Sequence, residues 1–443
     1  MILLFAACAR PTALEPDPSD APTWSGEVAP IVLGSCAGCH AAGAIAADWS
    51  FASYAEAAPY ASMIAAYTES GRMPPFPADE ADCDNPWGFT HDPRLTDDQV
   101  DTLAAWADAG APEGDPGALA PIEPPAPPTL PRVDQSLRAD TPYTIAPNDV
   151  AADTFACFVV DIGNPEPGWL EGVGVAPDNL PAVHHALVYL DPSGSTAGFV
   201  DETGWYDCFG GTGGDTILVG GYAPGATPLT TPAGSGIPVP AGSKLVVQMH
   251  YHAGDEPRVD HSAIELMWTA GPPAREVVVS LRGNAAGPEE GGMGLQPGPN
   301  DLGAPSFRIP AGVAGHTETL RYPIDTGGRD YAVFAVANHM HLVGTRMRAW
   351  VEKADGTEQC LLDTPRWDFD WQLIYGYDAA RAPIVRSGDT LVLQCTYDNT
   401  LQNSGVQRAL AELGLEAPVE VGLGEGTLDE MCIFFSGVVP VAQ

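Results

Sequence analysis

Ten histidines are spread over the 443 residues, and five of them occur at three places in the sequence. These are the adjacent pair His184-His185, then His250, and then His339 with His341. Two histidines at positions i and i+2 of a strand point to the same face. Imidazole is a common ligand for copper and other transition metals. His339 and His341 are therefore a candidate metal-binding pair.

The other histidines give weaker predictions. Adjacent residues of a strand point to opposite faces, so His184 and His185 can bind one ion only if the strand is twisted or bulged, or if one uses Nδ1. His252 shares a face with His250, which leaves it as a ligand, a neighbour of a ligand or a solvated residue. Isolated histidines are more often ordinary hydrogen-bonded residues; these are His91, His261 and His316.

A second constellation lies near the N-terminus. Cys36-Ala-Gly-Cys39-His40 is a C-x-x-C-H motif, in which two thiols form thioether bonds to a haem and the histidine becomes an axial iron ligand. Met73, which precedes two prolines, is our candidate for the second axial ligand, and Met63 is the alternative. The ordinary alternative is a disulfide between Cys36 and Cys39. We expect a c-type haem here.

The haem motif lies in a segment that we predict to be a small helical unit, residues 24–115. Its clearest helix starts at Thr96, where Gln99 completes a capping box, and ends before Gly110. The segment Trp106-Ala-Asp-Ala-Gly110 resembles one in a class of small c-type cytochromes, which implies a cytochrome c-like haem domain. Residues 116–139 are proline-rich and favour an extended linker.

The histidine groups fall in a different kind of sequence. From about residue 140, short apolar runs alternate with period two between Gly, Pro and Asp turns, which predicts strands. In Lys244–His252 the even-numbered residues, including His250, share one face. About 300 residues is generous for one sandwich. We therefore predict a mainly β fold of two tandem antiparallel β-sandwich, jelly-roll-like domains, 140–275 and 276–443.

Four segments of this β region occur in the order found in one known family. They are Val183-His-His-Ala-Leu-Val-Tyr189, Leu245-Val-Val-Gln-Met-His-Tyr251, Asn338-His-Met-His-Leu-Val-Gly344 and Asp429-Glu-Met-Cys-Ile-Phe434. In these segments the chain resembles the copper type II, ascorbate-dependent monooxygenases, the family of the peptidylglycine and dopamine β-monooxygenases. Four ordered matches of such unlike composition are more specific than any one alone.

The resemblance implies two copper sites. The ligands of the first site, which would relay electrons, are His184, His185 and His250. The catalytic site, which would meet dioxygen, is formed by His339, His341 and Met431. The soft thioether of a methionine favours Cu(I), although Met431 could also be an ordinary core residue. Gln248 matches the family too and is expected to support electron delivery beside the first site.

Six cysteines remain when Cys8 and the haem motif are set aside, and their spacing alone allows 15 full pairings. The resemblance implies a disulfide next to the methionine ligand, between Cys432 and Cys395. The weaker expectations are Cys157 with Cys208 and a leftover pair, Cys83 with Cys360. The segment Arg366–Tyr375 looks like one found in bacterial members of the family, and its aromatic residues favour a rigid strand.

Two positions depart from the peptide-amidating members of the family. An arginine two residues before the first histidine of the pair binds the substrate carboxylate there, and Ala337 stands in its place. A tyrosine four residues after the methionine is replaced by Phe435. Without these polar partners a peptide carboxylate would be poorly bound. We expect no amidation of glycine-extended peptides, and a more apolar substrate pocket.

Charge and the N-terminus bound the partners. The net charge of -39 repels phosphate backbones, so we expect no nucleic-acid partner. The apolar start ends in Phe5-Ala-Ala-Cys8, which resembles a lipobox, so residues 1–23 are expected to be an export signal or lipoprotein tether. Cys8 would be the only membrane contact, because no stretch of about 18 apolar residues follows. We expect an exported protein, periplasmic or held at the outer membrane or cell surface.

Together, the resemblance and the haem motif imply a copper-dependent monooxygenase with two copper ions and one haem c. It would hydroxylate a C–H bond of a small organic substrate with O2. Electrons would come from an ascorbate-like reductant, a redox protein or the fused haem, whose tether raises its local concentration. The competing interpretation is a non-catalytic haem and copper redox or copper-handling protein.

Overall fold

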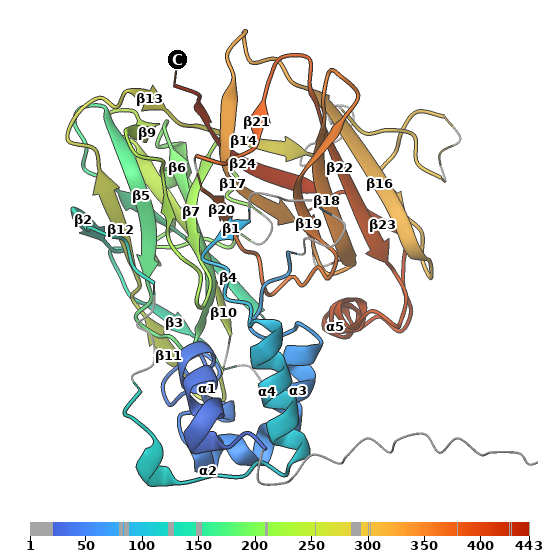
Figure 1. The fold of residues 1–443 in the computed structure, drawn as a ribbon. Coiled ribbons are helices and arrows are strands. Elements are labelled where there is room, and N and C mark those ends of the chain that lie inside the picture. The colour runs from blue at the N-terminus through green and yellow to red at the C-terminus, as the bar shows by residue number, and fades with distance from the viewer. Residues whose placement is uncertain are drawn as a thin grey trace, which may run out of the picture. The chain divides into compact units, whose positions relative to one another are not determined.

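The computed structural model describes residues 21–78, 83, 88–122, 128–147, 153–208, 211–252, 254–284, 294–299, 301, 303–378, 380–424, 426 and 428–442. The expected lipid anchor Cys8 lies outside these residues. The chain is mainly β, with several antiparallel sheets, as predicted (Figure 1). It divides into two compact units. The helical unit consists of Met1–Ala41, Asp48–Pro74 and Arg94–Pro125, and the β-rich unit of Ala42–Ala47, Pro75–Pro93 and Ala126–Gln443.

Four α-helices form the helical unit, namely α1 (Ala29–Ser35), α2 (Tyr54–Ala57), α3 (Ala61–Glu69) and α4 (Asp97–Asp108). The predicted capping box is confirmed, because the backbone N–H of Gln99 donates to the Thr96 hydroxyl and the backbone N–H of Thr96 to the Gln99 side chain. Trp24, Leu103 and Trp106 are buried in the core of this unit. Among the described residues, no helix is both long and apolar enough to span a membrane.

The β-rich unit contains two sets of sheets that follow each other in the sequence. In the first half a six-stranded sheet comprises β2 (Gln135–Leu137), β5 (Gly168–Ala176), β8 (Leu229–Thr230), β9 (Ser235–Val239), β12 (Ala263–Trp268) and β13 (Arg275–Glu276). A four-stranded sheet has the order β4 (Asp153–Asp161), β10 (Lys244–His252), β6 (Val183–Asp191) and β7 (Ile217–Tyr222). A small ribbon pairs β3 (Tyr143–Ile145) with β11 (Arg258–Asp260).

The second half repeats this plan (Figure 1). Its six-stranded sheet comprises β1 (Phe89–Thr90), β14 (Val278–Gly283), β17 (Tyr331–His339), β20 (Tyr375–Tyr377), β21 (Ile384–Val385) and β24 (Ile433–Pro440). Its four-stranded sheet has the order β16 (Ala314–Pro323), β22 (Thr390–Asp398), β18 (Gly344–Glu352) and β19 (Glu358–Thr364). The remaining elements are β15 (Arg308–Ile309), β23 (Val421–Gly422) and helix α5 (Ser404–Leu413).

The two halves are joined by a shared core. Strand pairing changes from the first set of sheets to the second between Glu276 and Val278. Buried apolar side chains of both halves nevertheless belong to one continuous cluster. Among the described strands, every pairing is antiparallel except that of β9 with β13. The halves therefore pack as one body, in which residues far apart in sequence have fixed positions.

Residues 75–93 belong to the β-rich unit, although they lie inside the range predicted for the helical one. The covalent reason is a disulfide between Cys83 and Cys360. The packing reason is a pair of aromatic rings, because Phe76 and Phe89 each lie 5.1 Å from the ring of Tyr375. The short strand β1 then adds itself to β20 at the edge of the sheet.

The cysteines pair as expected. The disulfides are Cys83–Cys360, Cys157–Cys208 and Cys395–Cys432. Cys36 and Cys39 are free thiols and do not form a disulfide with each other.

The expectation of an aromatic strand over Arg366–Tyr375 is wrong. Strand β19 ends at Thr364 and β20 begins only at Tyr375, so residues 365–374 form a loop, which we call the 365–374 loop. Asp368 closes turns here, because its side chain accepts the backbone N–H of Asp370 and its backbone carbonyl accepts that of Trp371.

We predict that the Cys83–Cys360 disulfide stabilises the β-rich unit by about 2–4 kcal/mol, because it closes a long loop in the unfolded chain. Cys83→Ser and Cys360→Ser should each lower the denaturant midpoint, and the two decreases should be equal. The double variant should lose no more than either single variant, since all three lose the same bond. Equal midpoints for the variants and the parent under oxidising conditions would contradict this.

Candidate metal centres

The three histidines predicted for the first site come from two neighbouring strands. His184 and His185 lie on β6, and His250 lies on β10, its antiparallel partner. His250 pairs with His185 and Tyr251 pairs with Val183, so the register shifts by one residue and His184 is left as a β-bulge. A bulge re-aims a side chain. The distortion that an adjacent histidine pair requires is therefore present.

The imidazoles converge through their Nδ1 atoms. The Nδ1 separations are 3.2 Å for His184 and His250, 3.4 Å for His184 and His185, and 3.1 Å for His185 and His250. The mean of these edges divided by √3 places a central point about 1.9 Å from each nitrogen, close to the 2.0–2.1 Å typical of a bond from a divalent metal to imidazole. All three side chains are at most 4% exposed. We call this set the three-histidine cup.

The surroundings of the cup are polar on one side and aromatic on the other. The Gln248 side chain donates 2.7 Å to the carbonyl of Cys208, which ties β10 to the Cys157–Cys208 bridge. Phe155 stacks on the ring of His250 with centroids 4.3 Å apart. His252 is not in the convergent group, but its ring centroid lies 4.1 Å from that of His184. In this geometry His252 is a neighbour of the predicted ligand His184.

The second predicted site lies where β17 ends and β24 begins. His339 is the last residue of β17, and its backbone pairs with Ile433, the first residue of β24. The ring centroids of His339 and His341 are 5.2 Å apart, with their planes at 82°. His339 Nδ1 lies 2.6 Å from Gln372 Oε1, and His341 Nδ1 lies 2.9 Å from the carbonyl of Asp429.

These hydrogen bonds set the tautomers of both histidines. Carbonyl oxygens only accept, so each Nδ1 carries the proton and donates it, and each Nε2 keeps a lone pair for a metal. Burial, with a smaller contribution from neighbouring His339, lowers the pKa of His341 to about 3. Burial also lowers the pKa of His339. Both imidazoles are therefore neutral at pH 7, as metal binding requires.

A buried carboxylate joins His341 to Met431. Glu430 is fully buried, and its Oε2 accepts the backbone N–H of His341 at 2.8 Å and that of Met431 at 3.1 Å. Its Oε1 accepts the N–H groups of Val343 at 2.7 Å and Gly344 at 3.0 Å. Burial raises the pKa of Glu430 to about 7, and the four N–H donors oppose that rise. One side chain thus holds the backbones of two predicted ligands.

Met431 is fixed from both sides. Its side chain is 3% exposed, and its carbonyl accepts a hydrogen bond of 2.9 Å from the Tyr397 hydroxyl. The next residue, Cys432, is bridged to Cys395 on β22. The backbone of Met431 is therefore locked beside that of His341. Methionine was predicted here from the family resemblance.

The two departures from the peptide-amidating enzymes face each other. Ala337 on β17 is the cross-strand partner of Phe435 on β24. Ala337 and His339 lie on the same face of β17, because side chains alternate along a strand. The sheet surface next to His339 is therefore apolar at the two positions where an arginine and a tyrosine bind a carboxylate in the amidating enzymes.

The haem motif lies in the helical unit directly after α1. The N–H groups of Cys39 and His40 both donate to the carbonyl of Cys36, which forms a tight turn. His40 Nδ1 lies 3.0 Å from the carbonyl of Trp49, which leaves Nε2 available for iron, and the ring stacks on Phe51 at 4.5 Å. The backbone N–H of Met73 donates to the carbonyl of Tyr67.

The alternative haem ligand also remains open. Met63 lies on α3 and packs against the buried core of the helical unit, whereas Met73 follows that helix and is half-buried. The choice between Met63 and Met73 stays a prediction.

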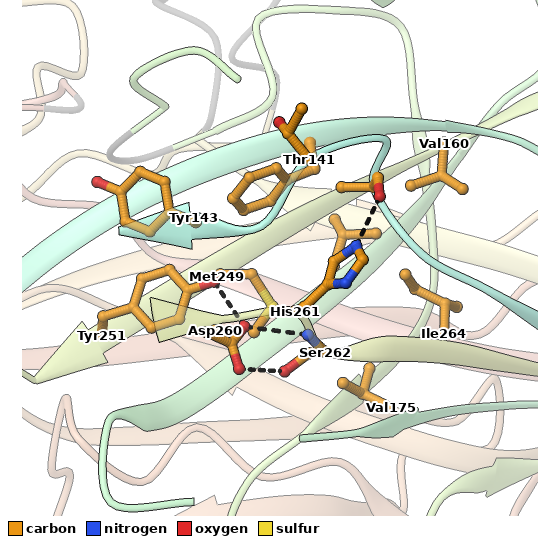
Figure 2. A pocket seen from close by; sticks show the side chains of 13 residues that line it. Thr141, Tyr143, Val160, Val175, Met249, Tyr251, Asp260, His261, Ser262 and Ile264 are labelled. Atoms are coloured by element: carbon orange, nitrogen blue, oxygen red, sulfur yellow. Dashed lines mark hydrogen bonds between the residues drawn. The ribbon is translucent and has the colours of Figure 1, made fainter. Parts of the chain in front are cut away.

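One small pocket opens on the other face of β10. Met249 and Tyr251 line it, and they alternate with the cup residue His250 along the strand (Figure 2). The Tyr251 hydroxyl donates 2.9 Å to buried Asp260 at its floor. The cavity volume is about 20 Å³, which is room for one water molecule. This pocket is therefore too small to enclose an organic substrate, and its lining residues do not include the cup histidines.

Sequence reasoning gave no role to three residues that contact the predicted ligands. Glu430 and Gln372 lie inside segments already noted for the family resemblance, and Trp371 precedes Gln372. The ring centroids of Trp371 and His184 are 5.9 Å apart. One signal was available in the sequence, because Glu430 is an acidic residue next to the predicted ligand Met431. Acidic side chains are rarely buried without hydrogen-bond donors, so a buried acid at this position would need partners.

The fold and the geometry thus define a β-rich protein with a buried cup of three imidazoles and a second histidine pair. Residues 308–437 match the family model of the C-terminal domain of copper type II ascorbate-dependent monooxygenases. The matched range includes His339, His341 and Met431. This match supports the family suggested by the sequence motifs, and it supports copper as the metal.

Two solved structures that are similar to this chain add nothing to that result. The VP2 subviral particle of infectious bursal disease virus is 11% identical, with 71% of this chain and 75% of that chain covered and a TM-score of 0.19. The tandem CBM22-1-CBM22-2 domain of Paenibacillus barcinonensis Xyn10C is 8% identical, with 66% and 79% covered and a TM-score of 0.16. Scores this low support no statement about fold or function.

We predict that Glu430→Gln destabilises the β-rich unit by about 2–6 kcal/mol, because an amide NH2 facing two backbone N–H groups leaves both without an acceptor, at about 1–3 kcal/mol each. Chemical denaturation of the metal-free protein measures this. The exposed Glu416→Gln is the matched control and should behave like the parent. A Glu430→Gln variant as stable as that control would show that the carboxylate does not hold these strands.

Proposed function

We propose that this chain is an exported copper monooxygenase that hydroxylates a C–H bond of a small organic substrate with O2. The observation that carries the proposal is the convergence of three buried Nδ1 atoms around a point at metal-bond distance from each. The family match over the region of the second site adds to it. In this proposal the cup holds one copper, and His339, His341 and Met431 hold the catalytic one.

The donor sets suit this assignment. Copper, when bound, would supply the one-electron and dioxygen chemistry that no amino-acid side chain provides. The cup offers three imidazole nitrogens on buried side chains. The second set adds a thioether to two imidazoles, and soft sulfur ligands favour the reduced ion. Gln372 and the carbonyl of Asp429 orient the imidazoles, and such partners raise the basicity of a ligand.

The apolar surface beside His339 determines the class of substrate. Ala337 and Phe435 offer no charge and no hydrogen bond to a carboxylate, and the ring of Phe369 lies 6.1 Å from that of His341. A site without polar partners discriminates against a substrate whose charged group it would strip of water. We infer an uncharged substrate presented by its apolar part, and no amidation of peptides.

The helical unit is proposed to carry a haem c as an electron donor. The free thiols of Cys36 and Cys39 lie in one turn, and His40 has its Nδ1 engaged, so these residues fit the covalent attachment and one axial bond. Met73 is proposed as the second axial ligand. An ascorbate-like reductant or a separate redox protein is the other donor class.

The proposed location is outside the cytoplasm, in the periplasm or at the cell surface, with Cys8 as a lipid anchor. Three disulfides in the described residues support this, because disulfides persist in oxidising compartments.

The proposed function is tested by copper content, oxygen uptake and product analysis on one preparation. We expect two copper ions per chain and, in a screen of uncharged organic substrates, hydroxylated product in proportion to the oxygen consumed. Met431→Ile should abolish product formation, whereas Met267→Ile, which alters a buried methionine of the other half, should retain it. Copper binding without any product would instead identify a non-catalytic redox or copper-handling protein.

The haem proposal has a separate test. The parent, expressed with a haem-attachment system, should carry covalent haem that acid-acetone does not extract, with one haem per chain by pyridine haemochrome. Replacing Cys36 and Cys39 by serine should abolish covalent attachment, since the two thioether bonds are lost. A Met73→Leu variant should lose the thioether-to-iron absorption band and keep the haem. Parent protein free of haem under these conditions would disprove the assignment.

A further inference from the structure

Two consecutive residues of the 365–374 loop contact a histidine of each candidate copper site. The indole of Trp371 lies against His184 of the three-histidine cup, with ring centroids 5.9 Å apart and planes at 60°. The side chain of Gln372 accepts the Nδ1 proton of His339 at 2.6 Å. Consecutive Cα atoms are only about 3.8 Å apart. A single dipeptide therefore links ligands that lie in different halves of the β-rich unit.

The loop is held in place by hydrogen bonds and an ion pair. The Gln372 amide nitrogen donates 3.2 Å to the carbonyl of Phe369, which turns its oxygen toward His339. The N–H of Trp371 donates 3.0 Å to the carbonyl of Asp368. Asp370 pairs with Arg408 of α5 at 3.4 Å. A shift of Trp371 would therefore be transmitted to Gln372.

The same loop contacts the other histidine of the second site. The indole N–H of Trp367 donates 3.1 Å to the carbonyl of His341. Both histidines of that site are thus restrained by the loop, whereas the cup is contacted by it through Trp371. Trp371 is therefore the loop residue to replace when the contact between the loop and the cup is tested.

We propose that Trp371 and Gln372 are positioning residues that couple the two copper sites, so that filling one site raises the affinity of the other. The proposal rests on the two-copper part of the proposed function. An ion in the cup fixes the ring of His184, which restricts Trp371 and, through the chain, Gln372 and His339. The second ion then binds to a site that is already partly ordered, so less conformational entropy is lost on binding. This is positive cooperativity. Such coupling is reciprocal.

Cu(I) alone is the probe for this test, titrated without oxygen against a chromophoric Cu(I) chelator. The overall constant for two ions in the parent is divided by the product of two single-site constants. The cup constant comes from the Met431→Ile variant and the second-site constant from the His185→Ala variant, which leaves His184 in place. We expect a ratio on the order of tenfold above one, within the usual range of coupling between sites.

The loop variants decide whether Trp371 carries the coupling. In a Trp371→Ala background the ratio should fall to one even if both single-site constants also fall. Trp371→Phe, which keeps a ring against His184, should retain most of the ratio. Phe369→Leu is the matched control, because Phe369 belongs to the same loop and contacts His341, and it should keep the ratio of the parent.

The outcomes separate this inference from the proposed function. Two Cu(I) sites with a ratio of one in the parent, or a ratio unchanged by Trp371→Ala, would overturn the coupling and leave the oxygenase proposal intact. Protein that binds no Cu(I) at either site would overturn both. The fluorescence of Trp371, obtained as the difference between parent and Trp371→Phe, should be quenched by the first equivalent of Cu(II), and no such quenching would also contradict the inferred contact.

Discussion

A single β-bulge at His184 is the constraint on which the cup depends. Without it, the adjacent side chains of His184 and His185 would point to opposite faces of β6, and no common point would lie near both. The register shift between His250 and Tyr251 turns His184 to the side of His185. The neighbouring strands β10 and β7 hold β6 on both edges, so the bulge is kept within the sheet.

The residues of the second site are brought together by other interactions. Its residues come from segments about 90 positions apart, and buried groups hold those segments together. Glu430 accepts hydrogen bonds from backbone N–H groups of both segments, and the Tyr397 hydroxyl donates to the carbonyl of Met431. The Cys395–Cys432 bridge fixes the next residue. The shared core of the two halves sets where these supports lie relative to the cup, and the 365–374 loop occupies the space between them.

Local patterns in the sequence were sufficient for features that depend on local geometry. Alternation placed His250 on one face of a strand, and the capping box of Thr96 and Gln99 marked a helix. Features that depend on distant segments were not predictable in this way. No pattern located the bulge at His184, and three of the four backbone donors to Glu430 come from a turn far away in sequence. The aromatic residues around Trp371 suggested a strand because the turn-forming role of Asp368 depends on its tertiary setting.

The three-histidine cup is proposed to bind one copper ion through its three Nδ1 atoms. Pulsed electron paramagnetic resonance on the protein loaded with one equivalent of Cu(II) tests it most directly, because it counts the imidazoles bound to the ion. We expect three equivalent sets of nitrogen couplings in the parent, and two when any one of His184, His185 and His250 is replaced by alanine. Variant spectra with the same nitrogen couplings as the parent would contradict binding of the ion by all three histidines.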